Sequence, residues 1–259
     1  MDNYLSFAVD LALNAGRLIK RLSRERHTIT YKGTVDLVTE ADLQSEALIV
    51  DGIRKRYPDH SILAEEEGAI EPGSDYLWII DPIDGTTNYA HGFPVYAVSI
   101  ALEFKGDLMV GVIYDPNLDE LFTAQQGKGA YLNGKPLHVS DIDDLNKTLL
   151  ATGFPYSFRN DPETILDCFR KFSLRAQGIR RAGAATIDLV GVASGRFDGY
   201  WEYGLKPWDM AAGGLIALEA GARITQLNGE PFDIRSPQIL ATNGRIHDQM
   251  LEIIAECSK

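Results

Sequence analysis

The chain has 259 residues, of which 45% are hydrophobic and 24% are charged, as in an ordinary globular protein that buries a sizeable core. Its formal net charge of -12 argues against a nucleic-acid partner, because proteins that bind nucleic acids neutralise phosphates with Lys and Arg. Apolar runs stay well below the roughly 18 residues of a membrane span, and the N-terminal residues lack the basic segment of a secretory signal. We therefore expect a cytoplasmic protein without membrane partners.

The cysteine content agrees with that location. Cys168 and Cys257 are the only two cysteines, and they are far apart in the sequence and show no metal-ligand spacing. Reduced thiols are therefore expected, as is usual in the cytoplasm.

Residues 1–147 are expected to form an α+β first half. Apolar residues recur at helical spacing in 3–24 and 40–56, with a short strand pair around Gly33 between them at 28–38. The strands expected after the second helix are 61–64, 76–80, 95–104, 108–114, 120–124 and 130–139. Turn-forming residues between several of these strands indicate hairpins, and hence antiparallel pairing.

Residues 148–259 alternate between strands and helices, which predicts an α/β second half. The expected strands are 149–152, 197–202 and 239–242. The expected helices are 161–176, 183–195, 209–221 and a last one at the C-terminus. Because no linker or low-complexity segment separates the halves, we expect a single unit, 1–259, with an active site between its two subdomains.

The segment from Trp78 to Asn88 is the most informative stretch of the sequence. An apolar run ends abruptly in Asp81 and Asp84, two carboxylates on a turn that Pro82 stiffens. Carboxylate oxygens are the ligands that hard divalent cations prefer. Gly85-Thr86-Thr87-Asn88 then offers backbone N–H groups where a helix could begin, which suits an anion. An ordinary turn after a strand uses the same residue types, so this segment alone leaves both interpretations open.

Further acidic residues could join this segment. Glu65 and Glu66 also follow an apolar strand, although a run of glutamates is more often a solvated surface. Asp209 precedes a helix of small residues, where a capping role is the simpler interpretation. Asp42 lies at the start of the second helix.

Taken together, these segments resemble the inositol monophosphatase family of Mg²⁺-dependent, lithium-sensitive phosphatases. The main matching motifs are Ala64-Glu65-Glu66, Trp78 to Asn88, and Trp208-Asp209-Met210-Ala211-Ala212-Gly213. The supporting matches are Lys32 with Asp36-Leu37-Val38-Thr39, Gly183-Ala184-Ala185, and Glu202. Their order and spacing agree across essentially the whole chain. The resemblance implies a layered αβαβα sandwich of the sugar-phosphatase type, usually a homodimer.

The resemblance also implies two to three Mg²⁺ ions in each active site. Their ligands would be Glu65, Asp81, the backbone carbonyl of Ile83, Asp84 and Asp209. Asp81 would bridge the first two ions, and a third, weaker ion would rest mainly on Glu65. Lithium would inhibit by occupying the second site.

The remaining roles concern catalysis and the substrate, a small phosphate ester. The catalytic residues implied are Thr86, Asp42 and Glu66, with Thr86 hydrogen-bonded to Asp42 and orienting the attacking water. The amides of Gly85 and Thr86 would bind the phosphate. The residues expected to contact the alcohol are Gly183, Ala184, Ala185, Glu202 and Lys206.

The sequence leaves the identity of the ester open. Lys206 stands where the animal inositol enzymes have a histidine, and Glu67 replaces the serine of the usual Gly-Glu-Glu-Ser motif. Myo-inositol 1-phosphate is the first hypothesis, and fructose 1,6-bisphosphate, histidinol phosphate and a 3′-phosphoadenosine nucleotide are the alternatives. Arg180 and Arg181 could bind a second phosphate or form a surface pair. A regulatory or binding protein with a residual metal site is a rival of another class, against which the intact ligand set argues.

Overall fold

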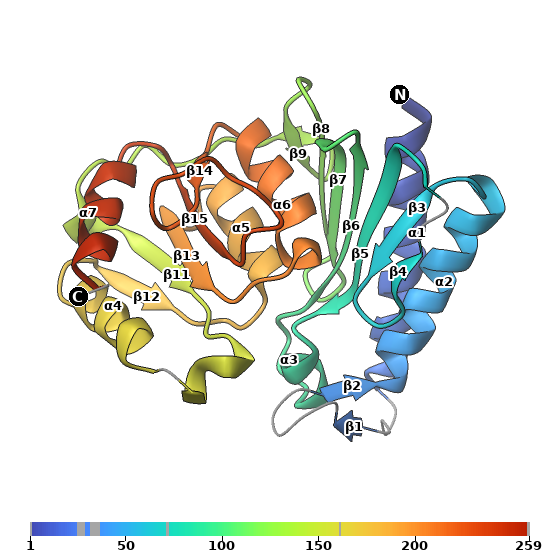
Figure 1. Cartoon of the computed structure of the whole chain (residues 1–259), viewed down its shortest axis with the longest axis horizontal. Helices are drawn as coiled ribbons and strands as arrows, with labels where there is room; N and C mark the ends of the chain where they lie inside the picture. The colour runs from blue at the N-terminus through green and yellow to red at the C-terminus, as the bar shows by residue number, and fades with distance from the viewer. Residues whose placement is uncertain (1, 25–28, 32–36, 71–72, 161, 258–259) are drawn as a thin grey trace.

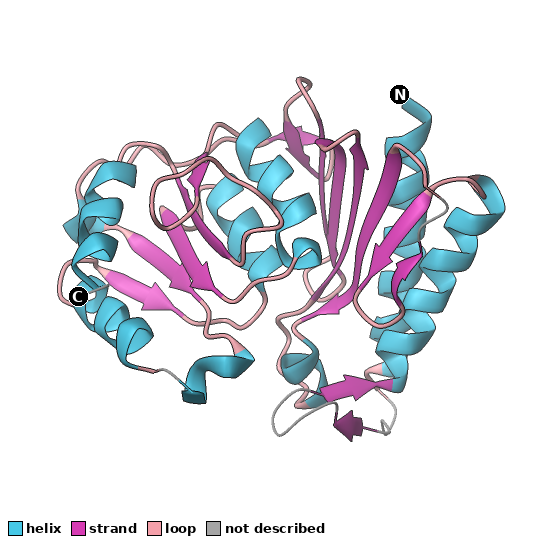
Figure 2. Cartoon of the chain, viewed as in Figure 1, coloured by secondary structure: helices cyan, strands magenta, loops and turns pink. Residues whose placement is uncertain are grey.

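The computed structural model describes residues 2–24, 29–31, 37–70, 73–160 and 162–257. Its helices and sheets alternate in αβαβα layers, so the expected sandwich is confirmed (Figures 1 and 2). The helices are α1 (Asp2–Leu22), α2 (Glu40–Arg56), α3 (Thr86–Ala90), α4 (Glu163–Ser173), α5 (Ala185–Ala193), α6 (Pro207–Glu219) and α7 (His247–Cys257), with 3₁₀ turns η1 (Leu145–Lys147) and η2 (Tyr156–Asn160). Within the part of the chain that the structure describes, no helix is both long and apolar enough to span a membrane.

The larger sheet has eight strands in the order β10-β9-β8-β7-β6-β5-β3-β4. Its strands are β3 (Ser61–Ala64), β4 (Gly68–Ile70), β5 (Tyr76–Asp84), β6 (Ala97–Phe104), β7 (Asp107–Asp115), β8 (Glu120–Gln125), β9 (Ala130–Leu132) and β10 (Lys135–Pro136). All neighbours are antiparallel except β3 and β5, which run parallel. The two parallel strands therefore end at the same edge of the sheet.

The smaller sheet has five strands in the order β12-β11-β13-β15-β14. Its strands are β11 (Leu149–Thr152), β12 (Gly178–Arg180), β13 (Gly199–Tyr203), β14 (Arg223–Thr225) and β15 (Gln238–Thr242). The first three run parallel, and β15 and β14 add antiparallel pairs. A separate two-stranded pair, β1 (Ile29–Tyr31) with β2 (Leu37–Thr39), precedes α2.

Helices cover both faces of each sheet, as Figure 1 shows. α1 and α2 lie on the outer face of the larger sheet, α5 and α6 lie between the sheets, and α4 and α7 cover the outer face of the smaller one. Each of these interfaces has its own group of buried apolar side chains.

Strand β5 is buried on both of its faces. Trp78 and Ile80 pack in the layer of α1 and α2, whereas Ile79 packs in the layer of α5 and α6. Burial of each such side chain contributes about 1.5–3 kcal/mol to folding. A strand covered on both faces needs a continuous apolar run rather than an alternating one, which is the pattern that the sequence shows.

Small residues let α6 approach both of its neighbours closely. A Cβ atom on Gly111 of β7 would lie 2.8 Å from the carbonyl oxygen of Ala212. On the other side, a Cβ atom on Gly213 would lie 2.7 Å from Cδ1 of Leu189 in α5. The Gly- and Ala-rich sequence of α6 is therefore a requirement of packing, and it fixes the position of the helix and of the residues at its start.

Three expectations from the sequence need correction. β5 continues to Asp84, with a register shift against β6 between Asp81 and Asp84, so the expected turn is the bulged end of a strand. α6 begins at Pro207, so Asp209 is its third residue and not the residue that precedes it. The strands β4, β12 and β14 were not expected, because three residues are too few to show a periodic pattern.

Two other segments agree with the expectation in part. The strand pair expected at 28–38 corresponds to β1 and β2, while its turn around Gly33 lies outside the described residues, as do Lys32 and Asp36. The segment expected at 130–139 forms the hairpin of β9 and β10, and the Asn133-Gly134 turn signal in its sequence is confirmed. Asn133 and Gly134 form its turn with φ angles of 49° and 76°, as an Asn-Gly turn requires.

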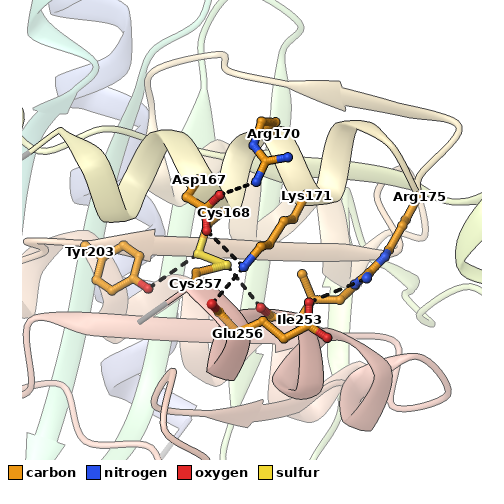
Figure 3. The surroundings of a disulfide bond; sticks show 9 residues. All are labelled: Asp167, Cys168, Arg170, Lys171, Arg175, Tyr203, Ile253, Glu256 and Cys257. Atoms are coloured by element: carbon orange, nitrogen blue, oxygen red, sulfur yellow. Dashed lines mark hydrogen bonds and ion pairs between the residues drawn. A yellow bond between two sulfur atoms is a disulfide. The ribbon is translucent and has the colours of Figure 1, made fainter. Parts of the chain in front are cut away.

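A disulfide joins Cys168 of α4 to Cys257 of α7 (Figure 3). The two residues are 89 positions apart in sequence, but their Cα atoms are 5.3 Å apart because the two helices pack against each other. Lys171 adds a second link, since its ammonium donates to the carbonyl oxygen of Glu256 at 2.7 Å (Figure 3). The expectation of reduced thiols is therefore wrong, and the cytoplasmic location that it supported stays a prediction.

We expect replacement of both cysteines by alanine to lower the free energy of unfolding by about 2–4 kcal/mol, because the disulfide restricts the unfolded chain across a long loop. Urea unfolding of the oxidised protein and of the double variant measures the difference. The oxidised protein should also show no free thiol after denaturation. Two titratable thiols, with equal stability before and after treatment with a reductant, would contradict the disulfide.

Candidate active site

The site is built where β3 and β5 end side by side. Ala64 pairs with Ile80 in the parallel register of these strands, so Glu65, the first residue after β3, lies next to Asp81, which still belongs to β5 and pairs with Ser99 of β6. The helix α3 follows β5 immediately at this edge (Figure 1). The topology thus explains why two short motifs, fifteen or so residues apart, present their carboxylates to one place.

A glutamate of α2 fixes the turn that carries Glu65 and Glu66. The carboxylate of Glu46 accepts hydrogen bonds from the amides of Glu66 at 2.9 Å and Glu67 at 2.7 Å. Glu46 is itself buried, with 2% of its surface exposed. The sequence analysis missed this residue, although its position one helical turn after Asp42 places both on the same face of α2.

Asp42 and Thr86 are in contact, as expected. The Thr86 hydroxyl lies 3.1 Å from Oδ1 of Asp42 and 2.9 Å from the carbonyl oxygen of Ile83. The other oxygen of Asp42 accepts from the amide of Thr39 at 2.8 Å and from its hydroxyl at 2.5 Å, which closes a capping box at the start of α2. Burial raises the pKa of Asp42 to about 6, against the opposing effect of the hydrogen bonds from Thr39.

The bulged end of β5 is held by hydrogen bonds at each residue. Oδ1 of Asp81 accepts from the amide of Ile83 at 3.0 Å, and Ser45 of α2 donates to the carbonyl oxygen of Pro82 at 3.0 Å. Asp81 and Asp84 are 2% and 8% exposed. These hydrogen bonds fix the backbone of the bulge, and with it the positions of the two buried carboxylates.

Asp84 connects the first half of the chain to the second. Its Oδ2 accepts from the amide of Thr186 at 2.7 Å and from the hydroxyl of the same residue at 2.5 Å, across 102 positions of sequence. Thr186 lies in the first turn of α5, so the carboxylate meets the positive end of that helix. The sequence analysis did not include Thr186, whose only signal was its place directly after Gly183-Ala184-Ala185.

Gly85 lies in a close contact between the halves. It has a φ of 92°, and a Cβ atom at this position would lie 2.8 Å from the carbonyl oxygen of Val95 and 3.2 Å from Cβ of Ala184. The side-chain amide of Asn88 donates to the carbonyl oxygens of Val95 and Ala182, both at 2.8 Å. The expected phosphate loop and the segment 183–185 are therefore adjacent, and no side chain fits between them.

Asp209 approaches from the second half, in the first turn of α6. One of its oxygens, Oδ2, accepts from the amide of Lys206 at 2.7 Å. The side chain of Lys206 is exposed beside it. A carboxylate in the first turn of a helix is stabilised by the helix dipole, so α6 favours a negative charge at this place.

The crowding of carboxylates raises their pKa values. Burial raises the pKa of Asp81 well above its ordinary value, and the neighbouring Glu65 and Asp84 raise it further. Burial, followed by the charge of Asp84, does the same to the pKa of Asp209. Several buried acids that repel one another, all with oxygen donors, fit a divalent cation, which would offset the repulsion.

The side chains do not yet form a metal-binding group in the conformation described. Among the described residues, no three His, Cys, Asp or Glu side chains gather closely enough to hold an ion. Asp84 and Asp209 each direct one oxygen to a backbone amide, at 2.7 Å in both cases. The donor set is therefore suited to a cation by its chemistry and by its position at the strand end.

The expected substrate side contains a buried glutamate. Glu202 on β13 is 9% exposed and accepts a hydrogen bond from the hydroxyl of Tyr200 at 2.6 Å. Its carboxylate packs directly against the backbone of Gly153. A Cβ atom at position 153 would collide with this carboxylate, so the position requires glycine. Burial raises the pKa of Glu202 to about 7, although Tyr200 and Arg181 oppose the shift.

One buried acid was not anticipated. Asp188 of α5 is completely buried, and neither of its carboxylate oxygens has a hydrogen-bond partner in the described part of the chain. Burial raises its pKa well above the ordinary value, and the charges of Glu202 and Asp84 add to the shift. Its one signal in the sequence was a single charged residue inside the otherwise apolar helix.

The two arginines considered for a second phosphate differ in position. Arg181 lies against Gly183, donates to the carbonyl oxygen of Phe154 at 3.2 Å, and is near enough to lower the pKa of Glu202. Arg180 donates to the carbonyl oxygen of its own neighbour Ile179 and is exposed. Both side chains are exposed, and only Arg181 has contacts with residues of the candidate site.

Comparisons with known proteins agree with this architecture. The model of the inositol monophosphatase family matches residues 1–259. An inositol-1-monophosphatase of Synechocystis sp. is 45% identical over 98% of this chain and 90% of its own, and the Nus factor SuhB of Pseudomonas aeruginosa is 44% identical over 98% and 96%. The solved inositol monophosphatase of Anabaena sp. superimposes with a TM-score of 0.90 at 44% identity, over 98% of this chain and 96% of that one. The chain therefore belongs to the inositol monophosphatase family of phosphatases.

Proposed function

We propose that this phosphatase hydrolyses myo-inositol 1-phosphate with the help of Mg²⁺. The observation that carries the proposal is the contact of Asp84 with Thr186, at 2.7 and 2.5 Å, together with the approach of Gly85 to Ala184. Through these contacts the acidic strand end, the phosphate loop and the expected sugar-binding segment adjoin one another. The name of the Synechocystis relative supports the same substrate.

The family is generally metal-dependent, and the acidic set fits that requirement. The ligands proposed for two to three Mg²⁺ ions are Glu65, Asp81, the carbonyl oxygen of Ile83, Asp84 and Asp209. Bound divalent cations supply charge neutralisation for the phosphate and lower the pKa of water. In this proposal Li⁺ competes for the same carboxylates and inhibits.

The residues of the chain position the remaining groups. The amides of Gly85 and Thr86 hold the phosphate. The hydroxyl of Thr86 donates a hydrogen bond to Asp42, so that a lone pair of the hydroxyl oxygen can accept a hydrogen bond from the attacking water. Glu66, whose turn is anchored by Glu46, is proposed to complete the catalytic group.

Glu202 and the segment 183–185 are proposed to select the alcohol. A carboxylate held by Tyr200 is a fixed acceptor for a ring hydroxyl, and the small residues at 183–185 let the ring approach the backbone. The exposed Lys206 and the nearby Arg181 would favour an ester with a second anionic group, so fructose 1,6-bisphosphate remains the alternative that the geometry supports best.

Family membership does not decide between these esters, since the relative from Pseudomonas aeruginosa is named a Nus factor. A panel of phosphate esters, assayed for released phosphate in Mg²⁺, distinguishes them. Myo-inositol 1-phosphate should give the highest kcat/KM, and a higher value for another ester would replace it as the substrate. A homodimer, which light scattering measures, is part of the same proposal.

Replacing Asp209 with asparagine should lower kcat/KM by at least about a hundredfold, because the amide cannot neutralise a cation that stabilises the transition state. Phosphate release at saturating Mg²⁺ measures the effect. Asp141→Asn is the control, because that exposed acid pairs with Arg245 far from the site and should leave activity unchanged. A fully active Asp209→Asn variant would exclude the residue as a ligand.

Thr86→Val should lower kcat by about a hundredfold with little change in KM, because the hydroxyl orients the water rather than binding the ground state. Thr86→Ser keeps the hydroxyl and should retain most of the rate. The double variant with Asp42→Asn should lose no more than the worse single variant, since the two groups act as one unit. An increase in KM alone would assign Thr86 to phosphate binding instead.

Glu202→Gln should reduce kcat/KM for myo-inositol 1-phosphate by at least about tenfold more than for an aryl phosphate, which has no ring hydroxyls to donate to it. The ratio of the two values in each protein is the measurement, and it cancels a general loss of active enzyme. Equal losses on both esters would show that Glu202 supports the folded site rather than selecting the alcohol.

A further inference from the structure

Helix α5 begins without a capping side chain of its own. Ala184 stands at its N-cap position, where it has no side-chain hydrogen bond to offer. The first amides of a helix lack partners within the helix, and a side-chain oxygen usually accepts from the second or third of them. In α5 that acceptor is Oδ2 of Asp84, from the end of β5, which bonds to the amide of Thr186, the second residue of the helix, at 2.7 Å. A proposed metal ligand therefore caps a helix that belongs to the other half of the chain.

The hydroxyl of Thr186 adds a second donor to the same oxygen. It donates to Oδ2 of Asp84 at 2.5 Å, and Thr186 is completely buried. A carboxylate oxygen offers about two lone pairs, so the two donors of this one residue occupy Oδ2. A cation bound by Asp84 is then left with Oδ1.

The hydroxyl matters because the terminal torsion of an aspartate has only broad energy minima. A residue without a hydroxyl at position 186 would keep the amide bond but lose the second donor, so the carboxylate of Asp84 would turn more freely. Groups that hydrogen-bond to a metal-ligating carboxylate orient it, and their removal typically lowers metal affinity by about 10–100-fold.

We propose that Thr186 is a positioning residue for the cation at Asp84, since its amide and hydroxyl hold Oδ2 and so present Oδ1 to the ion. This inference rests on the proposed metal dependence of the enzyme. Thr186 directly follows the segment 183–185, which is proposed to contact the alcohol. The same hydrogen bonds therefore fix the metal ligand relative to the substrate side of the site.

Binding of Mn²⁺ to the full-length protein tests this role without an assay of activity. Electron paramagnetic resonance counts the free ion, and Mn²⁺ prefers the same oxygen ligands as Mg²⁺. Asp84→Asn should lose one bound ion, which identifies the site in question. Thr186→Val, which keeps the shape and removes the hydroxyl, should bind that ion about tenfold or more weakly. Thr186→Ser keeps the hydroxyl and should bind it as the wild-type protein does.

Thr148→Val is the matched control. Thr148 is also completely buried, but its hydroxyl donates to the carbonyl oxygen of Leu145 at 2.7 Å and not to a carboxylate of the site. It should leave Mn²⁺ binding unchanged. Thermal unfolding in a chelator measures the stability of each variant alone, and the rise in midpoint on addition of Mn²⁺ should be smallest for Thr186→Val. Thr186→Ala serves the same purpose if Thr186→Val is unstable.

The outcomes separate this inference from the proposed function on which it rests. Unchanged Mn²⁺ binding by Thr186→Val would overturn the inference, and tighter binding would do so by showing that Thr186 competes with the ion for Asp84. An equal loss of affinity in Thr186→Ser and Thr186→Val would assign the effect to packing rather than to the hydroxyl. If Asp84→Asn instead bound every ion that the wild-type protein binds, the proposed metal site itself would be refuted.

Discussion

The whole site depends on the hydrogen bonds that stabilise buried carboxylates at the end of β5. Asp81 and Asp84 lie almost entirely out of water, where a charge without partners is strongly disfavoured. Among the described residues, their hydrogen-bond donors are backbone amides and the hydroxyl of Thr186. The hydrogen bonds from Thr186 to Asp84 have a second effect, because they connect the end of β5 in the larger sheet to the first turn of α5.

The packing on either side explains why this geometry is reproducible. β5 is clamped between two helical layers, with Trp78 and Ile80 on one face and Ile79 on the other. On the opposite side, the glycines at 111 and 213 let α6 lie so close to β7 and α5 that its first turn has little freedom. The carboxylates of the candidate site thus lie at the ends of rigid elements, so that only their side chains are free to move.

Much of the fold and of the candidate site could be predicted from sequence, for physical reasons. Long amphipathic segments such as 3–24 and the doubly buried run before Asp81 carry strong periodic or compositional signals. Strands of three residues, the bulge between Asp81 and Asp84, and the pairing of Cys168 with Cys257 depend on tertiary contacts, which no local pattern contains. The supporting residues Glu46 and Thr186 were missed for the same reason, since each is a common residue type in a helix until its partner across the fold is known. Asp188 was missed because its burial depends on how α5 packs, which no local pattern contains.

The helix α6 places two acidic residues of the protein in electrically different surroundings. Asp209 in its first turn faces backbone N–H groups that favour its charge, whereas Glu219 in its last turn faces carbonyl groups that oppose it. Both oxygens of Glu219 accept from backbone amides, those of Gly127 and Gly129, which offset the unfavourable field of the carbonyl groups. Asp209 has the helix field in its favour, but burial and the charge of Asp84 still raise its pKa well above the ordinary value. The neighbours of each acid therefore matter more than its place on the helix: backbone donors satisfy Glu219, whereas Asp209 lies among like charges that a cation would offset.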